Sequence, residues 1–398
     1  MKKMQYFFIL GRIPDLSIAE LSKFANLQEE APLKIRKKSS KFIVIETDKE
    51  IDISFWQKQL GGVIKSGKII GKADKIQEEE IKDILLGYQK EKRIFFGLSF
   101  YSPDNRFSFR EAKNYSLGLK KILKKEKISI SFIIEKDRPF LSSGNILRQR
   151  LLEKGVELVF LIEEKEILIG ATQALQSIKE EAEFDFLRPY RNISQGLIPP
   201  KLAKIMINLA SVKKEEIILD PFCGSGTILG EALLMGHKNL IGSDIDEKLV
   251  EETRKNLEWL QESFSGKISN QVKIKIFRSD IKDIWREIPP GSIDAIITEP
   301  YLGPMQVKKI KIQNIVNDLS SLYLQSFKSF KKILKPDGRI VIIFPVFRIE
   351  KRQYFLPIIE QIQSLGFKKE NLSSSGRGSL LYSRPDQTVL REFFIFHL

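Results

Sequence analysis

The 398-residue chain carries a formal net charge of +15, and its hydrophobic content of 42% is enough to build buried cores. Its length predicts two or three domains, and its single cysteine, Cys223, excludes both a disulfide framework and a zinc cluster within one chain. No apolar run is long enough to span a membrane, so we expect a cytoplasmic protein. The positive charge indicates a polyanionic partner, unless the whole proteome is basic.

Residues 1–90 mix strand and helix patterns. The first apolar run, at 6–10, follows two lysines but is too short for a secretory signal peptide, so it predicts a strand. Further strands are expected at 42–46 and 63–70, and helices from Pro14 to about Asn26, at 56–60 and at 78–89. This mixture predicts an α+β domain of ferredoxin-like type.

Residues 91–177 form a second block with a concentrated positive charge. Strands are expected at 94–100, 128–135, 158–162 and 167–171, with a Lys-rich helix at 112–125. A basic cluster of this kind suits phosphate groups, although a solvated helix face shows the same pattern. The candidate phosphate-binding residues of this block, which the resemblance given below implies are RNA contacts, are Lys120, Lys121, Lys124, Lys125, Arg138 and Arg148.

The most informative stretch is the segment 220–227, which reads Asp-Pro-Phe-Cys-Gly-Ser-Gly-Thr. An apolar strand at 216–219 precedes it and a helix at 228–235 follows, so a carboxylate, a glycine turn and a helix start meet where open α/β sheets bind ligands. Leu229 replaces the third glycine of a dinucleotide fingerprint, and Asp220 would repel a pyrophosphate. The pattern therefore favours a cationic ligand such as S-adenosylmethionine over a simple structural corner.

Two more acidic residues follow predicted strands. Asp244 ends the strand at 240–244, about 20 residues beyond the turn, where an acidic side chain can accept both ribose hydroxyls. Asp246 is the other candidate at this point, but we assign it to the cap of the next helix. Asp280 follows the strand at 273–277 and suits either a ligand contact or a helix cap.

A fourth strand, at 293–298, delivers Glu299-Pro300-Tyr301-Leu302-Gly303 to the same edge of the sheet. Strands at 338–345, 366–367 and 389–396 complete the expected sheet, with the last strand antiparallel. The basic loop between the last two strands, which contains Arg377 and Arg384, is a candidate RNA contact.

Several of these stretches resemble one family. The segment 220–227 resembles motif I of the class I amino-methyltransferases, and 299–303 resembles their motif IV, usually Asp/Asn-Pro-Pro-aromatic. Leu141-Ser142-Ser143 followed by 152–158 resembles the end of a THUMP domain, an RNA-binding module. The whole chain is thus similar to the THUMP-containing class I tRNA guanosine-N2-methyltransferase family, the strongest similarity being in the catalytic domain.

The resemblance implies a ferredoxin-like domain at 1–90, a THUMP-like domain at 91–177, a linker at 178–199 and a methyltransferase domain with a Rossmann-like doubly wound sheet at 200–398. It implies methyl transfer from S-adenosylmethionine to the N2 amine of a guanosine in tRNA, usually at position ten, without a metal or a membrane. In that family the two N-terminal domains grip the 3′ end of tRNA. The implied catalytic residues are Glu299, Pro300 and Tyr301, and the implied cofactor-binding residues are Pro199, Asp220, Pro221, Phe222, Cys223, Gly224, Gly226, Thr227, Asp244, Ile245, Asp280 and Ile281.

The motif at 299–303 departs from the family pattern. Glu299 is one methylene longer than Asp, and the aromatic Tyr301 stands third, with Leu302 in the usual aromatic place. Two alternatives therefore stay open: a DNA adenine-N6 or cytosine-N4 methyltransferase, and a non-catalytic tRNA-binding protein that keeps the cofactor pocket. The sequence also leaves open the target nucleotide, mono- or dimethylation, the oligomeric state and any partner subunit.

Overall fold

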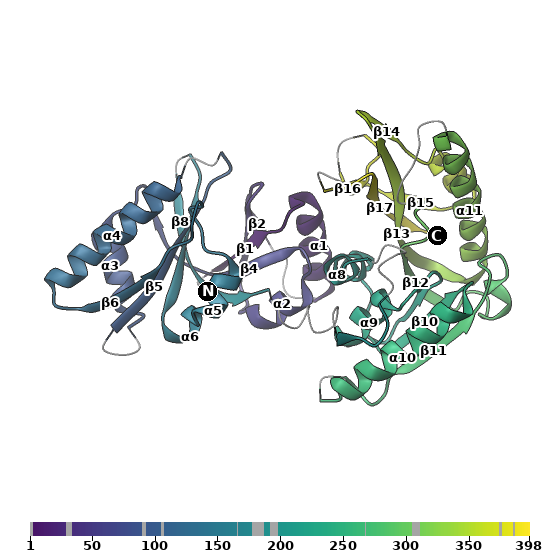
Figure 1. Ribbon diagram of the computed structural model, residues 1–398, viewed down its shortest axis with the longest axis horizontal. Helices are drawn as coiled ribbons and strands as arrows, with labels where there is room; N and C mark the ends of the chain where they lie inside the picture. The colour runs from purple at the N-terminus through teal and green to yellow at the C-terminus, as the bar shows by residue number, and fades with distance from the viewer. Residues whose placement is uncertain are drawn as a thin grey trace. The chain divides into compact units, whose positions relative to one another are not determined.

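The computed structural model places the chain in two compact units, which Figure 1 shows. The N-terminal unit comprises Met1–Ile18 and Gln28–Ile178, and the C-terminal unit comprises Ala19–Leu27 and Lys179–Leu398. Most of the expected linker at 178–199 lies outside the described residues. The structure describes residues 3–28, 34–89, 93–104, 107–164, 166–176, 187–191, 198–266, 268–304, 311–373, 376–384 and 387–398.

The N-terminal unit is built on one sheet in the order β2-β3-β1-β4-β8-β7-β5-β6. Strands β4 and β8 pair antiparallel, so the first 90 residues and the following block share one sheet. The expected division into two domains at residue 90 stays a prediction. Strand β2 was not predicted because its residues are mostly basic, as suits an edge strand. The strands are β1 (Met4–Leu10), β2 (Lys34–Lys38), β3 (Phe42–Thr47), β4 (Val63–Ala73), β5 (Arg93–Tyr101), β6 (Ser129–Ile133), β7 (Val156–Ile162) and β8 (Ile167–Leu175).

Helix α4 has one apolar side and one side that carries lysines. Ser108 and Glu111 form a capping box at its start, and its apolar side buries Leu119 and Leu123 in the core below the sheet. The opposite side, which carries the lysines, must then face solvent. The helices of the N-terminal half are α1 (Pro14–Leu27), α2 (Ile53–Gln59), α3 (Glu78–Leu86), α4 (Phe109–Lys125), α5 (Ser143–Arg148) and α6 (Leu151–Lys154).

A buried ion pair lies inside the N-terminal sheet. The Lys65 ammonium on β4 donates to the Glu157 carboxylate on β7 at 2.5 Å, and both side chains are almost fully buried. Ser99 and Thr172 also donate to this carboxylate, while Lys65 donates to the Leu141 carbonyl. Removing one partner would leave a buried charge at a cost of about 3–5 kcal/mol, so the cluster couples four strands and the start of α5.

The C-terminal unit contains the predicted Rossmann-like doubly wound sheet, in the order β11-β10-β9-β12-β13-β17-β15. The strands from β11 to β13 are parallel, and β17 is antiparallel to both of its neighbours, as expected. Two short strands, β14 and β16, pair with β13 and β17. The strands are β9 (Ile217–Asp220), β10 (Asn239–Asp244), β11 (Lys273–Arg278), β12 (Ile293–Thr298), β13 (Leu334–Ile349), β14 (Arg352–Tyr354), β15 (Lys368–Glu370), β16 (Leu380–Tyr382) and β17 (Val389–His397).

This strand order places a topological switch point between β9 and β12. The chain continues from β9 to β10 on one side of that point and from β12 to β13 on the other. The rings of Phe327, Phe344 and Phe394 pack in a core beneath β13 and β17, which supports this side of the sheet. None of the described helices combines the length and the apolar character needed to cross a membrane. The helices of this unit are α8 (Pro200–Ala210), α9 (Thr227–Leu234), α10 (Glu247–Ser263), the 3-10 helix η2 (Ile284–Arg286), α11 (Ile312–Ile333) and α12 (Ile359–Ser364).

Candidate functional site

The turn after β9 is shaped by two glycines in the left-handed region. Gly224 has φ +52° and Gly226 has φ +84°, and the Gly226 N–H donates to the Cys223 carbonyl at 2.7 Å. A side chain at Gly226 would press on Thr253, whereas one at Gly224 would meet no atom of the described residues within 4 Å. The backbone at Gly224 therefore borders open space that a ligand can occupy.

Asp220 is the buried acid of this site, with 1% of its surface exposed. Its Oδ1 accepts hydrogen bonds from the Thr298 hydroxyl at 2.7 Å and the Phe222 N–H at 3.2 Å, so that, as far as the described residues go, Oδ2 can accept from a ligand. Burial raises the pKa of Asp220 to about 7, and the carboxylates of Asp244 and Glu299 add to this shift against the two hydrogen bonds. A buried carboxylate of this kind gains most from a cationic ligand.

Asp244 and Asp280 both accept hydrogen bonds from backbone N–H groups. Asp244 accepts from the Gly224 N–H at 3.0 Å and from the Asp246 N–H at 3.1 Å, so it ties the glycine turn to β10. Asp246 caps α10 through the Lys248 N–H, as assigned from the sequence. Asp280 accepts from the Lys282 N–H at 3.0 Å within a turn. The next helix, η2, has Asp283 at its N-cap, so the expected helix cap at Asp280 is wrong, and its ligand role stays a prediction.

The other predicted cofactor residues differ in how far they are exposed. Ile245 is 61% exposed, so its apolar side chain is free to cover a planar ring, whereas Ile281 is buried. The Cys223 thiol and the Thr227 hydroxyl point inward, to Thr253 and Arg188 respectively. The predicted cofactor-binding residues come from four places in the chain. These are the start of α8 at Pro199, the turn with Pro221 and Phe222, the end of β10 and the end of β11.

The loop after β12 places Glu299 beside the buried acid. The hydrogen bond from Thr298 to Asp220 joins the ends of β12 and β9 directly. Tyr301 is 60% exposed, while Gly303 has φ +89°, and a side chain there would press on the Phe347 ring. The structure thus brings the two predicted motifs to one site, with an exposed aromatic ring at its border.

Glu299 forms an ion pair that the sequence analysis missed. The Arg391 guanidinium on β17 donates to both carboxylate oxygens, at 2.6 Å and 3.1 Å, and about a tenth of each side chain is exposed. The two residues are 92 positions apart, so no local pattern links them. One signal was available, because Arg391 and Glu392 interrupt an otherwise apolar strand and buried charges need partners.

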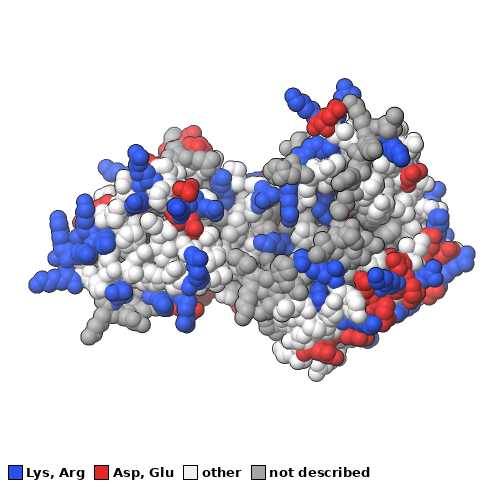
Figure 2. Space-filling view, in the orientation of Figure 1, with Lys and Arg blue, Asp and Glu red and all other residues white. Residues whose placement is uncertain are grey.

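The predicted RNA-binding residues fall on both units. Figure 2 shows Lys and Arg side chains gathered at the end of the N-terminal unit where Figure 1 places α4. Lys121, Lys124 and Lys125 are exposed there, and Lys120 lies 5.8 Å from the Phe132 ring. Arg148 is exposed as well. These positions suit phosphate contacts, which stay a prediction.

The two arginines of the C-terminal loop differ in their availability. Arg384 is exposed, and its guanidinium donates to the hydroxyl of its neighbour Tyr382 at 3.2 Å. Arg377 donates to the Glu392 carboxylate at 2.8 Å and to the Leu356 carbonyl at 3.1 Å. Its guanidinium therefore holds the loop to the sheet, and this favours Arg384 as the RNA contact of the two.

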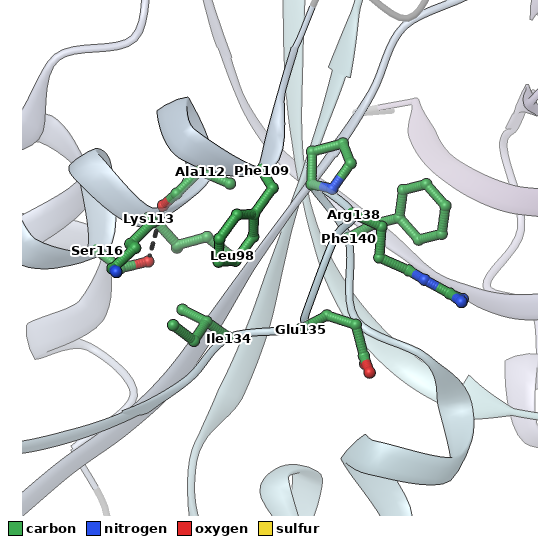
Figure 3. A pocket seen from close by; sticks show the side chains of 10 residues that line it. Leu98, Phe109, Ala112, Lys113, Ser116, Ile134, Glu135, Arg138 and Phe140 are labelled. Atoms are coloured by element: carbon green, nitrogen blue, oxygen red, sulfur yellow. Dashed lines mark hydrogen bonds between the residues drawn. The ribbon is translucent and has the colours of Figure 1, made fainter.

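A small pocket opens in the N-terminal unit between α4 and the segment after β6 (Figure 3). Arg138 is exposed at its border, 5.8 Å from the Phe140 ring, and Lys113 adds a second cation. Glu135, which also lines it, accepts from the Ser142 N–H and hydroxyl at 2.9 Å and so holds the start of α5. A basic and aromatic border of this kind is compatible with the RNA contact predicted for Arg138.

The comparisons with known proteins cover both motifs. A family model described as an RMKL-like methyltransferase domain matches residues 188–353, which include the glycine turn and the Glu299 loop. A protein of Methanothermococcus thermolithotrophicus named "Probable tRNA (guanine(10)-N2)-dimethyltransferase" is 36% identical over 143 residues, which are 35% of this chain and 77% of that protein. The chain belongs to the RMKL-like family of RNA methylases. This confirms the predicted S-adenosylmethionine-dependent methyltransferase domain.

Other relatives show how much of the chain is similar in sequence and how much in fold. The tRNA (guanine(10)-N2)-dimethyltransferase of Methanocaldococcus jannaschii is 35% identical over 173 residues, and the chain spans only 44% of that protein's length. The crystal structure of TrmN from Thermus thermophilus aligns over 99% of both chains with a TM-score of 0.54 and 14% identity, so it shows the fold of both units and nothing more. A DNA methylase model also matches, at residues 37–255, but it ends before the Glu299 loop that the RMKL-like family model includes.

Proposed function

We propose that this chain transfers a methyl group from S-adenosylmethionine to the exocyclic N2 amine of a guanosine in tRNA. The observation that carries the proposal is the hydrogen bond from Thr298 to Asp220, which sets the cofactor-side acid directly beside the loop bearing Glu299. The names of the relatives support guanine N2 in tRNA as the target, and position ten is the first candidate. A tRNA substrate would place the protein in the cytoplasm.

The residues around the glycine turn fit the proposed methyl donor. Asp220 suits its ammonium group, Asp244 suits its ribose hydroxyls, and the exposed Ile245 suits the face of its adenine. The open space beside Gly224 admits a ligand close to the backbone. S-adenosylmethionine supplies an electrophilic methyl group on a sulfonium, whose positive charge is compatible with these acids.

The loop at 299–303 suits the exocyclic amine of guanine, which is the proposed methyl acceptor. The lone pair of a guanine amine is delocalised into the ring, so the amine is a weak nucleophile. The Glu299 carboxylate and the Pro300 carbonyl would accept its two N–H groups, hold the nitrogen in place and favour loss of the proton that methyl transfer releases. Tyr301, with its exposed ring, would stack on the base.

Incubation of unmodified tRNA with the full chain and S-adenosylmethionine, followed by mass spectrometry of the nucleosides, tests the proposal. We expect N2-methylguanosine or N2,N2-dimethylguanosine, and sequencing of the modified tRNA would locate it. Parallel reactions with duplex DNA test the DNA methylase alternative, which N6-methyladenine or N4-methylcytosine would support. Binding of both ligands without methylation of any tRNA would instead favour the non-catalytic alternative.

Substitution of Tyr301 should separate stacking from hydrogen bonding. Tyr301→Phe is expected to keep methyl transfer within about twofold, whereas Tyr301→Ala should lose about 10–100-fold in kcat/KM, since base stacking contributes about 1–3 kcal/mol. Leu302→Ala is the matched comparison, because Leu302 stands where the family usually has its aromatic residue. A greater loss for Leu302→Ala than for Tyr301→Ala would assign the base contact to Leu302.

Charge reversal on α4 should weaken tRNA binding. The double variant Lys124→Glu/Lys125→Glu is expected to lower tRNA affinity at least tenfold at about 0.1 M salt. It should also reduce the slope of log K against log salt by about 0.7–0.9 for each phosphate that the variant no longer neutralises. Lys328→Glu/Lys332→Glu, on exposed positions of α11, changes the net charge equally and serves as the control. Equal losses in both variants, measured by fluorescence anisotropy, would show that α4 holds no specific RNA contact.

A further inference from the structure

The Arg391–Glu299 pair is built more rigidly than a surface ion pair. Arg391 lies in β17 between β13 and β16, opposite Pro345 on one side and Tyr382 on the other, so its backbone is held from both sides. Its guanidinium meets Glu299 through two hydrogen bonds, and both side chains are close to 90% buried. A planar fork in this arrangement fixes the carboxylate in direction as well as position.

The pair compensates for the length of Glu299. A Glu side chain has one more rotatable bond than the Asp usual at this place in the family, and misplacement of a reacting group by about 1 Å can cost roughly a hundredfold in rate. Each carboxylate oxygen has two lone pairs, so Glu299 can accept from Arg391 and from an amine at the same time. The ion pair therefore orients the Glu299 carboxylate and still leaves it lone pairs with which to accept a hydrogen bond from the amine.

The charges around Glu299 also require a cation. Its carboxylate interacts with the buried acid Asp220 on β9 and with the Tyr323 hydroxyl on α11, and Tyr382 on β16 faces Arg391. Burial disfavours the charged guanidinium, but Glu299 outweighs this and raises the pKa of Arg391. Among the described residues that interact with Glu299, Arg391 is the one that carries positive charge.

We infer that Arg391 is a positioning residue for methyl transfer, which holds the Glu299 carboxylate aimed at the target amine. This inference rests on the proposed function. It assigns to β17 a role that the loop motif alone does not contain. It also explains how Glu can stand where the family usually has Asp.

The test compares Arg391→Gln and Arg391→Lys with Glu392→Gln in the full chain. Glu392 is the next residue of β17, and its buried carboxylate forms an ion pair with the partly exposed Arg377, so Glu392→Gln controls for the loss of an ion pair from the same strand. For Arg391→Gln we expect kcat to fall about 10–100-fold while KM for tRNA and the calorimetric affinity for S-adenosylmethionine change less than threefold. Arg391→Lys should recover part of kcat, because it restores the charge without the fork.

The pH dependence of kcat distinguishes positioning from general support of the fold. Without the guanidinium, two neighbouring carboxylates favour protonation of one, so Arg391→Gln should lose activity at a higher pH than the wild type as pH falls. In a double-mutant cycle with Glu299→Gln, the unfolding free energies should be non-additive. Glu392→Gln should leave the pH profile unchanged.

Two results would overturn the inference while the proposed function stands. The first is an active wild type in which Arg391→Gln has the same kcat and pH profile. The second is an Arg391→Gln variant whose losses match those of Glu392→Gln in every measurement, which would make the pair purely structural. A wild type that methylates no tRNA would overturn the proposed function, and the role of Arg391 with it.

Discussion

Glu299→Gln is expected to lower the rate of methyl transfer about 10²–10⁴-fold, the range of a lost general base. The amide keeps the length of the side chain but loses the negative charge that favours removal of the amine proton. It also leaves the buried guanidinium of Arg391 without its counter-ion. Single-turnover kinetics with tRNA and S-adenosylmethionine would measure the loss, with both ligands at saturating concentrations.

Binding measurements separate this loss from a folding defect. Affinities for tRNA and for the cofactor should stay within about threefold of the wild type at pH 8, because Asp220 is largely ionised at that pH and phosphate contacts dominate tRNA affinity. Glu392→Gln again supplies a matched buried acid, on the face of β17 where Arg377 and Ser379 bind it. Full activity in Glu299→Gln would mean that the acid only anchors Arg391, and Pro300 and Tyr301 would then have to orient the amine alone.

Asp220→Asn is expected to act in opposite directions on binding and on stability. Loss of the charge-assisted contact to the cofactor ammonium, worth about 1.5–3 kcal/mol, should weaken S-adenosylmethionine about 10–150-fold at pH 8. The same change should raise the free energy of unfolding at pH 8, because it removes a desolvated charge while its side-chain oxygen still accepts from Thr298 and Phe222. The gain in unfolding free energy is on the order of a few kcal/mol.

The pH window of this effect follows from the pKa of Asp220, which burial raises from 3.8 to about 7. The folded state holds the proton more tightly than the unfolded state, so the charge costs no stability below about pH 4. The cost grows as pH rises through this window and is complete above about 7. The difference in unfolding free energy between variant and wild type should therefore increase between pH 4 and 7 and then level off.

Cofactor binding should show the matching dependence. Only the ionised carboxylate pairs with an ammonium group, so wild-type affinity should rise towards pH 7, by up to tenfold per pH unit, and then flatten. Asp220→Asn should remove this rise, whereas Asp246→Asn, an exposed helix cap close by, should keep it. Calorimetry across this range would check both variants, and a pH-independent wild-type affinity would place the ammonium away from Asp220.

The sequence alone was enough to predict the parts of the site that are local. Asp220, the two glycines and α9 follow one another directly, and their strand–turn–helix pattern depends on short-range apolar periodicity and on backbone freedom at glycine. The same holds for Glu299 after β12 and for the lysines of α4, because the apolar face of that helix dictates which side is exposed. The antiparallel last strand was expected as well, and the pairing of β17 with β13 and β15 confirms it.

The tertiary structure decided the contacts between distant segments. The bond from Thr298 to Asp220 and the Arg391–Glu299 pair join residues 78 and 92 positions apart, and only the strand order of the sheet brings them together. Pairing of β4 with β8 likewise merges the first two blocks into one sheet, although each block reads separately as α+β. Local patterns specify which side chains are buried, but the partner of a buried charge depends on register between strands, and register is set by the packing of the whole unit.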